Sequence, residues 1–427
     1  MRGSSGDLGV HGPETDLGLS YRLSFIVALA LLLNSVLRGI RAPAYWGATH
    51  LLFNYHFGFV KRALLGSLIA SVDAPYLYHY NFYFWVSLAI FAGDVWLIIV
   101  LSRLLCRIGD VDARVSVLVY CSSIGIVFLA HTIGWPDQIV LLITLVAVLC
   151  RNFYVRALLV TGLFGCCILI HEGAFLTFFP VVCFRFIADL ADRPDGRKVI
   201  VLCALVVVIT ATVLFVGLRP PLTVATAAAM QHMLQLKADF PLNTNGFLVL
   251  TRTFGGNLEH TVACTRQSSR IAWLLLWFLP AMIVTLPTAT YLLRRSLIDL
   301  AARGYGLAVR SAAIGAALSP LSLHFLGCDN NRWFALATLT SFLVFGISHL
   351  FFPRTLVATS RRSRKGGFRW SIALIALNIG SAIALFAGYE VQDFPYEGHV
   401  EDVAAMLEGQ APFPPRPEPI RDVVLHN

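Results

Sequence analysis

The chain has 427 residues, of which 57% are hydrophobic and only 13% are charged, and its mean hydropathy is +0.72. Soluble globular domains carry about 25% charged residues, so this composition excludes an ordinary soluble fold and indicates a membrane protein. The formal net charge of +9 is spread over short loops. That distribution excludes the continuous basic surface of a nucleic-acid-binding protein and is typical of loops retained in the cytoplasm.

The apolar runs predict membrane-spanning helices. A span takes about 20 residues, and a backbone inside the bilayer must satisfy its own hydrogen bonds, which favours helices over open strands. We expect an all-α, polytopic integral membrane protein with about 11 transmembrane helices (10–12). The first run is followed by Arg38 and Arg41 and not by a small-residue cleavage site, which indicates a retained span after a cytoplasmic tail, 1–21. Single spans are expected near 22–40, 82–102, 115–133, 138–150, 199–218, 272–293, 311–327, 333–352 and 370–389.

The run 157–186 decides the orientation of everything that follows it. At 30 residues it is long for one span and short for two, and His171-Glu172-Gly173 lies in its middle. If the run is a hairpin that turns there, five loops with 19 of the 33 Lys and Arg residues all face the cytoplasm. A single crossing would send the most basic of these loops, 353–369, to the outside. The sequence therefore predicts the hairpin.

This topology collects the polar segments of the chain on the outer face. The transmembrane domain, 22–389, then has two long outer loops, 41–81 and 219–271. The second loop is expected to carry a helix over 225–236 and to act as a lid, with Arg252 and His260 as contributors. The tail 390–427 is rich in proline and predicts an extended extracytoplasmic appendage.

Lys61 and Arg62 stand out in the first outer loop. The spacing of Leu64, Leu65, Leu68 and Ile69 predicts an amphipathic helix in the membrane interface, with the two cations in its first turn. Free backbone N–H groups there favour an anion, so a phosphate or pyrophosphate group is the expected ligand. The alternative is that both cations anchor the helix to anionic lipid.

His171 and Glu172 form an ionisable pair at the end of a long apolar run. Such pairs are costly to insert into a membrane and point to function. We expect Glu172 to act as a general base, with His171 tuning it or binding phosphate. The alternative is a polar pair that only stabilises the turn.

A third cluster combines Asp329, Arg332 and Trp333 at the start of a span. Arginine contacts phosphate through two N–H groups, and an indole offers a flat surface to a sugar ring. The alternative is a local Asp329–Arg332 ion pair at the helix start. Asp137, after Trp135-Pro136, is a further candidate for substrate binding, with an N-cap of the next helix as its alternative.

Other polar residues give weaker signals. Asp94 lies in the middle of a span and must face protein or water. The nine cysteines have no metal-ligand spacing, so no metal and no cofactor is expected. Cys264 and Cys328 both fall on the outer side, where a disulfide between them is permitted.

Together, a basic outer segment after the first span, an outward acidic turn and an Asp-x-x-Arg-Trp turn resemble bacterial membrane glycosyltransferases and polysaccharide polymerases. These enzymes use polyprenyl-linked sugars, and many share the C-type glycosyltransferase architecture. C-type enzymes usually carry a catalytic acid early in the first outer loop, whereas here that loop has only Asp73, near its end. The departure favours a polymerase over a single-sugar transferase.

The resemblance implies a multi-pass protein of the bacterial inner membrane that assembles surface polysaccharide. Its partners would be a polyprenyl-linked sugar or oligosaccharide, membrane lipid and other polysaccharide-assembly proteins, with no nucleic acid. Lys61, Arg62 and Arg332 would hold the carrier phosphate, and Glu172 or Asp329 would deprotonate the acceptor hydroxyl. Two alternatives stay open: a transporter or flippase for a lipid-linked glycan or anionic solute, and a membrane acyltransferase that modifies the polysaccharide.

Overall fold

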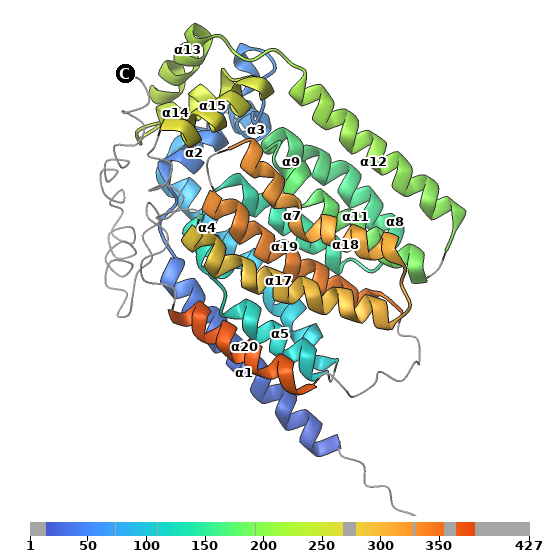
Figure 1. Ribbon diagram of the computed structural model, residues 1–427. Helices are drawn as coiled ribbons and strands as arrows, with labels where there is room; N and C mark the ends of the chain where they lie inside the picture. The colour runs from blue at the N-terminus through green and yellow to red at the C-terminus, as the bar shows by residue number, and fades with distance from the viewer. Residues whose placement is uncertain are drawn as a thin grey trace, which may run out of the picture.

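The computed structural model describes residues 14–72, 74–108, 110–192, 194–267, 279–327, 330–353 and 364–380. Every regular element in these ranges is a helix, which confirms the predicted all-α class (Figure 1). The first half of the chain forms α1 (Glu14–Gly39), α2 (Tyr45–Leu52), η1 (Tyr55–Phe57), α3 (Leu64–Val72), η2 (Pro75–Tyr78), α4 (Tyr80–Arg107), α5 (Val111–Cys121), α6 (Ile124–His131), α7 (Pro136–Leu149), α8 (Phe153–Leu159), η3 (Val160–Phe164), α9 (Gly165–Ile170), α10 (Ala174–Thr177) and α11 (Phe179–Asp192). The second half forms α12 (Gly196–Gly217), α13 (Val224–Gln235), α14 (Thr244–Leu250), α15 (Phe254–Gln267), α17 (Leu279–Ala302), α18 (Leu307–Leu318), η5 (Ser319–Phe325), α19 (Asn330–Phe351) and α20 (Arg364–Gly380).

Long apolar helices make this a membrane protein. Among the described residues five segments are long and apolar enough to cross a bilayer: Tyr21–Gly39, Tyr80–Arg107, Phe153–Ile170, Gly196–Gly217 and Arg332–Phe351. A sixth is added if α5 and α6, which meet at a bend of 42°, form one broken span. The predicted count of about eleven spans stays a prediction.

The run 157–186 does fold as a hairpin. The phenyl rings of Phe164 and Phe179 lie 5.6 Å apart, and farther from the turn Phe153 and Phe186 lie 5.1 Å apart. Contacts that pair residues symmetrically about 171–173 require two antiparallel arms. The turn lies at His171, Glu172 and Gly173, as the distribution of basic residues predicted.

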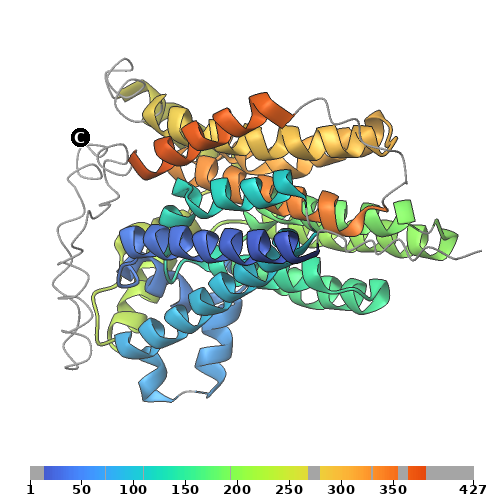
Figure 2. The ribbon, with the colours of Figure 1, turned by 90° about the horizontal axis from the view of Figure 1, so that it is seen from below.

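The bundle is built around α19. This helix is largely buried and packs against α17, α18 and α6, whereas α12 lies at the edge and exposes most of its apolar side chains (Figure 1). On another side, α1 packs along α5 and α6 (Figure 2). The exposed valine and leucine side chains of α12 fit a helix that faces lipid.

The predicted outer segments gather at one end of this bundle, here called the loop end and formed by α2, α3, α13, α14 and α15 (Figure 1). A second hydrophobic core joins them. In it, Phe53 at the end of α2 packs against Phe247 of α14, and Met230 of α13 is fully buried. The predicted helix 225–236 is confirmed by α13. Four of the predicted basic loops are paired at the opposite end, 151–156 with 185–198 through Arg156–Asp189 and 294–310 with 103–114 through Arg295–Asp112. Which end faces the outside stays a prediction.

One local prediction is wrong. Helix α3 begins at Leu64, so Lys61 and Arg62 precede it and do not occupy its first turn. The reason is that Arg62 has a φ of 66°, in the left-handed region that a right-handed helix cannot continue. Asp73, Cys328 and Asp329, the side chain of Cys264 and the tail 390–427 lie outside the described residues, as does the N-terminal tail up to residue 13.

Candidate active site at the loop end

An Arg62–Glu172 ion pair links the first loop of the chain to the turn of the hairpin. Arg62 Nε donates to Glu172 Oε2 at 2.8 Å and Arg62 Nη2 donates to Oε1 at 2.7 Å. The two side chains are 11% and 28% exposed, respectively. This planar, two-bond arrangement is the strongest geometry available to an Arg–carboxylate pair. It fixes the position of Arg62, which the left-handed backbone aims at the turn.

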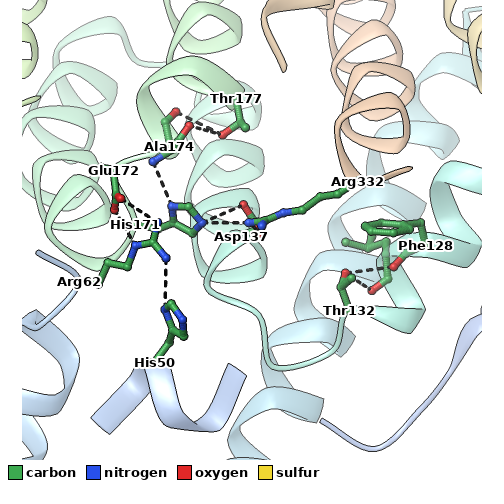
Figure 3. A network of polar contacts seen from close by, with 12 residues as sticks. His50, Arg62, Phe128, Thr132, Asp137, His171, Glu172, Ala174, Thr177 and Arg332 are labelled. Atoms are coloured by element: carbon green, nitrogen blue, oxygen red, sulfur yellow. Dashed lines mark hydrogen bonds and ion pairs between the residues drawn. The ribbon is translucent and has the colours of Figure 1, made fainter. Parts of the chain in front are cut away.

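A second cluster joins α19, α7 and the same turn. Arg332 Nη2 donates to Asp137 Oδ2 and lies 2.9 Å from His171 Nε2. All three side chains are buried. His171 therefore lies between the two Arg–carboxylate pairs, with Arg62 and Glu172 on one side and Asp137 and Arg332 on the other (Figure 3).

Both ring nitrogens of His171 face donors. The backbone N–H of Gly173 lies 3.0 Å from Nδ1, and Arg332 approaches Nε2. A neutral imidazole accepts at one nitrogen only, so only one of these contacts is a hydrogen bond in either tautomer. Asp137 Oδ1 lies 4.0 Å from Nε2, close enough for its charge to stabilise a protonated ring. The ring is thus placed where a proton can be taken up and stabilised.

Burial and charge set the protonation states of the turn. Burial lowers the pKa of His171 to about 4, against the opposing effect of Asp137, so the ring is neutral at pH 7. Burial alone would raise the pKa of Glu172, but the charge and hydrogen bonds of Arg62, helped by Lys61, hold it well below its usual range. Glu172 is therefore ionised. With Lys61, Arg62 and Arg332 against Asp137 and Glu172, the site carries one net positive charge.

Tryptophan rings enclose Arg332. The guanidinium lies 4.7 Å from the ring centre of Trp135 and 4.6 Å from that of Trp333. Trp333 is buried, and its indole N–H approaches the carbonyl of Gly327 at 3.4 Å. Trp135 is half-buried, and its ring centre lies 4.7 Å from that of Trp46. These contacts hold Arg332 rigidly.

The segment that contains α13 and α14 covers the site. Lys61 Nζ donates to the carbonyl of Arg252 at 3.2 Å, and the backbone N–H of Asn243 donates to Thr49 Oγ1 at 2.9 Å. Arg252 thus contributes its carbonyl to the contact with Lys61. The same segment is also packed against the first loop by the second hydrophobic core, in which Phe247 contacts Phe53, so its role as a lid stays a prediction.

Six of the residues singled out in the sequence come together here. They are Lys61, Arg62, Asp137, His171, Glu172 and Arg332, with Trp333 packed behind Arg332. The N-cap interpretation of Asp137 is wrong, because Trp135 occupies the N-cap position of α7 and the Asp137 carboxylate bonds to Arg332. Asp329 lies outside the described residues.

His50 is a site residue that the sequence analysis missed. Its Nδ1 lies 3.5 Å from Arg62 Nη1, on the side of Arg62 away from His171 (Figure 3). The available signal was weak: a histidine among the apolar residues of the aromatic first loop, twelve positions before Arg62. Only the fold shows that it reaches the same guanidinium.

The arrangement is suited to an anionic ligand and a proton transfer. A small pocket beside Asp137 and Arg332 is lined by apolar side chains that include Phe128, Leu141 and Phe178. In the part of the chain that the structure describes, no three His, Cys, Asp or Glu side chains are grouped as metal ligands. Family models, curated proteins and solved structures give no match to this chain.

Proposed function

We propose that the protein transfers a sugar or oligosaccharide from a polyprenyl phosphate or pyrophosphate carrier during surface polysaccharide assembly in a bacterial inner membrane. One observation carries the proposal. Four segments far apart in the chain bring two Arg–carboxylate pairs and a neutral histidine together at one end of an apolar helical bundle. A polyprenyl carrier has the matching chemistry, since its long hydrocarbon tail favours the membrane and its anionic head favours the cations.

The cations have a defined task in such a reaction. Transfer breaks the bond between the sugar's anomeric carbon and the phosphate oxygen, and the departing phosphate keeps the electron pair. Lys61 and Arg62 are placed to stabilise that developing charge, and fixed charges of this kind are usually the largest catalytic contribution. Asp137 and two indoles restrain Arg332, so its positive charge adds to that of Lys61 and Arg62 without a movement of the side chain.

We assign the proton acceptor to His171 rather than to Glu172. Both oxygens of Glu172 accept hydrogen bonds from Arg62, which leaves this carboxylate a weak base and makes it the residue that positions Arg62. His171 is neutral, and its lone pair faces one donor, the Gly173 N–H or Arg332, so taking a proton requires a single contact to break. A phosphate bound nearby would raise its pKa, and Asp137 would stabilise the imidazolium after it takes the acceptor hydroxyl proton. Asp329 stays a candidate for the same role.

The lipid-linked glycans of the cell test this proposal. We would analyse them by mass spectrometry in cells that lack the protein, that carry His171→Gln, or that carry Glu172→Gln. One defined intermediate should accumulate in all three strains. A complete repeat unit would identify a polymerase, which we favour, and a truncated unit a single-sugar transferase. An unchanged lipid-linked pool would exclude glycosyl transfer.

One observation favours a second candidate, a transporter or flippase. Asp94 lies in α4 at 0% exposure, and neither carboxyl oxygen has a hydrogen-bond partner among the described residues. Buried acids inside spans often mark ion or substrate paths. For a flippase, Asp94→Asn would retain lipid-linked glycans at the cytoplasmic face, whereas for a transferase it would leave the size of the intermediates unchanged.

A further inference from the structure

His50 is enclosed in the loop end. It lies in α2, is 2% exposed, and its ring centre is 3.8 Å from that of Trp46 and 4.9 Å from that of Phe53. Aromatic rings on two sides hold the imidazole plane in place. Its two nitrogens therefore point in fixed directions.

The contact with Arg62 determines the tautomer of His50. A guanidinium only donates, so Nδ1 is the accepting nitrogen toward Arg62 Nη1. Burial, followed by the charge of Arg62, lowers the pKa of His50 well below its usual value, so the ring is neutral. The single proton of the neutral ring is then on Nε2. Within the described part of the chain, Nε2 is buried and has no hydrogen-bond partner.

A gap lies beside this nitrogen. Gly246 of α14 faces it, and a Cβ added to Gly246 would lie 3.5 Å from Nε2 and 3.4 Å from Thr49 Cγ2. Both are ordinary contact distances, so the gap is the space that a methyl group bonded to Gly246 would fill. A buried donor without an acceptor is costly, and native proteins rarely keep one without a reason.

We propose that His50 is a substrate-binding residue, whose Nε2–H donates to an oxygen of the carrier phosphate on the side of the ring that faces Gly246. The inference rests on the proposed function and adds a residue to its site. An anionic oxygen is the acceptor that fits, because Arg62 lies directly beside His50 and the site has one net positive charge. The lid segment would then contact the ligand through the backbone of Gly246, in addition to covering the site.

Two amides separate the roles of the two ring nitrogens. In His50→Gln the side-chain N–H₂ takes the place of Nε2 and keeps the donor to the ligand. In His50→Asn the side-chain oxygen takes the place of Nδ1 and keeps only the contact with Arg62. Gly246→Ala fills the gap with a methyl group and leaves both histidine nitrogens intact. Gly255→Ala is the matched control, since its nearest neighbouring atom would be 3.9 Å away.

The experiment is equilibrium binding of undecaprenyl phosphate, in detergent micelles, to the purified full-length protein. His50→Asn and Gly246→Ala should each weaken binding by about tenfold to a hundredfold, the loss expected for one hydrogen bond to a charged group. His50→Gln should stay within about threefold of wild type, and Gly255→Ala should match it. Binding of inorganic phosphate is measured in parallel. If its affinity depends on His50 as strongly as that of the lipid, the free anion is sufficient. If only the affinity for the lipid depends on His50, the carrier is the ligand.

The outcomes separate this inference from the proposed function. If wild type binds undecaprenyl phosphate and both His50→Asn and Gly246→Ala bind it equally well, the assignment of His50 is overturned while the transferase proposal stands. If wild type does not bind the lipid phosphate at all, both are overturned. Should His50→Asn fail to fold, Gly246→Ala still decides the question, because alanine is favourable in a helix and no atom lies closer than 3.4 Å to the added methyl group.

Discussion

The two ends of the bundle both bury arginine–carboxylate pairs, yet they are built differently. At the opposite end, Arg185 and Asp189 are four residues apart on one helix, and Arg156 joins them from the other arm of the same hairpin. At the loop end, the paired residues are 110 and 195 positions apart in sequence. The opposite end also has one long-range pair, Arg295–Asp112, 183 positions apart, but its carboxylate is 48% exposed. Short-range pairs hold neighbouring helices together. Long-range pairs bring distant segments to one point.

The partners of the arginines differ as well. At the opposite end, Arg303 donates to the carbonyls of Ser348 and Phe352, which closes the last turn of α19. At the loop end, the arginines contact two neutral histidines and lie beside a gap. A buried ion pair alone therefore does not mark a functional site. The combination of distant segments, titratable neighbours and an unsatisfied donor does.

The largest effect should come from the opposite end, in Asp189→Ala. Arg156 and Arg185 both bond to this carboxylate and are 0% and 3% exposed, so removing it leaves two buried positive charges. We expect a loss of about 3–5 kcal/mol in the free energy of unfolding. Reversible unfolding in detergent would measure it.

Glu172→Ala is the matched variant at the loop end. It releases one arginine that is 11% exposed, so its cost should be smaller, about 1–2 kcal/mol. If Glu172→Ala destabilises the fold as much as Asp189→Ala does, the loop-end pairs are structural and the contrast between the two ends fails.

The second prediction concerns how the stability of the fold depends on pH through His171 at the loop end. The folded-state pKa of His171, about 4, lies below the unfolded value near 6.5, so acid protonates the unfolded chain first. The contribution of His171 is complete above about pH 6.5 and is lost as the pH falls toward 4, by about 3 kcal/mol over that window. His50, whose pKa is also lowered, acts in the same direction.

Melting temperatures between pH 4.5 and 7.5 check this prediction. His171→Gln cannot titrate, so its melting temperature should fall less steeply with acid than that of wild type. Identical slopes for the two proteins would mean that folding does not shift the pKa of His171, and the buried ring would then not be held neutral by its surroundings.

Part of the site could be predicted from the sequence. The excess of basic residues in five loops placed the His171-Glu172 turn at the same end as Lys61, Arg62, Asp137 and Arg332, because it fixed the number of crossings between them. The hairpin and α13 followed from length and composition. These are properties of whole segments, and composition and charge average over many residues.

What could not be predicted depends on single atoms. The backbone of Arg62 turns left-handed, and nothing in Val60-Lys61-Arg62-Ala63 indicates it. Arg332 bonds to Asp137, 195 positions away, which no local pattern in the sequence indicates. His50 reaches Arg62 because α2 and α3 pack against each other within the first loop. Tertiary packing determines such contacts, and no local pattern in a single sequence indicates them.

The third prediction is the effect of Arg332→Lys on transfer. A lysine keeps the charge but loses the planar group that lies between two indoles and reaches both Asp137 and His171. We expect about 100-fold slower transfer, since misplacing one catalytic group by about 1 Å costs on that order. Conversion of the lipid-linked intermediate in membrane vesicles would measure the rate. Arg295→Lys, at the exposed pair with Asp112, should leave it unchanged.

The smallest effect compares glycine with alanine at one arginine from each end. Among the described residues, Arg62 is the non-glycine residue with a positive φ, 66°, whereas Arg156 lies inside α8. Arg62→Gly and Arg62→Ala both remove the ion pair with Glu172, so their difference isolates the backbone. Glycine adopts a positive φ without cost and other residues pay about 1–2 kcal/mol, so Arg62→Gly should be the more stable of the two by about 1 kcal/mol.

At Arg156 the order should reverse, because glycine is about 1 kcal/mol less favourable than alanine inside a helix. Unfolding free energies of the four variants, measured under one condition, would give the difference between glycine and alanine at each position. If alanine is the more stable replacement at both positions, the left-handed backbone at Arg62 does not exist in solution, and the loop does not aim this guanidinium at the turn. Opposite orders of glycine and alanine at the two positions would show that the backbone at Arg62 is strained. They would also show that Arg156 is placed by a regular helix instead.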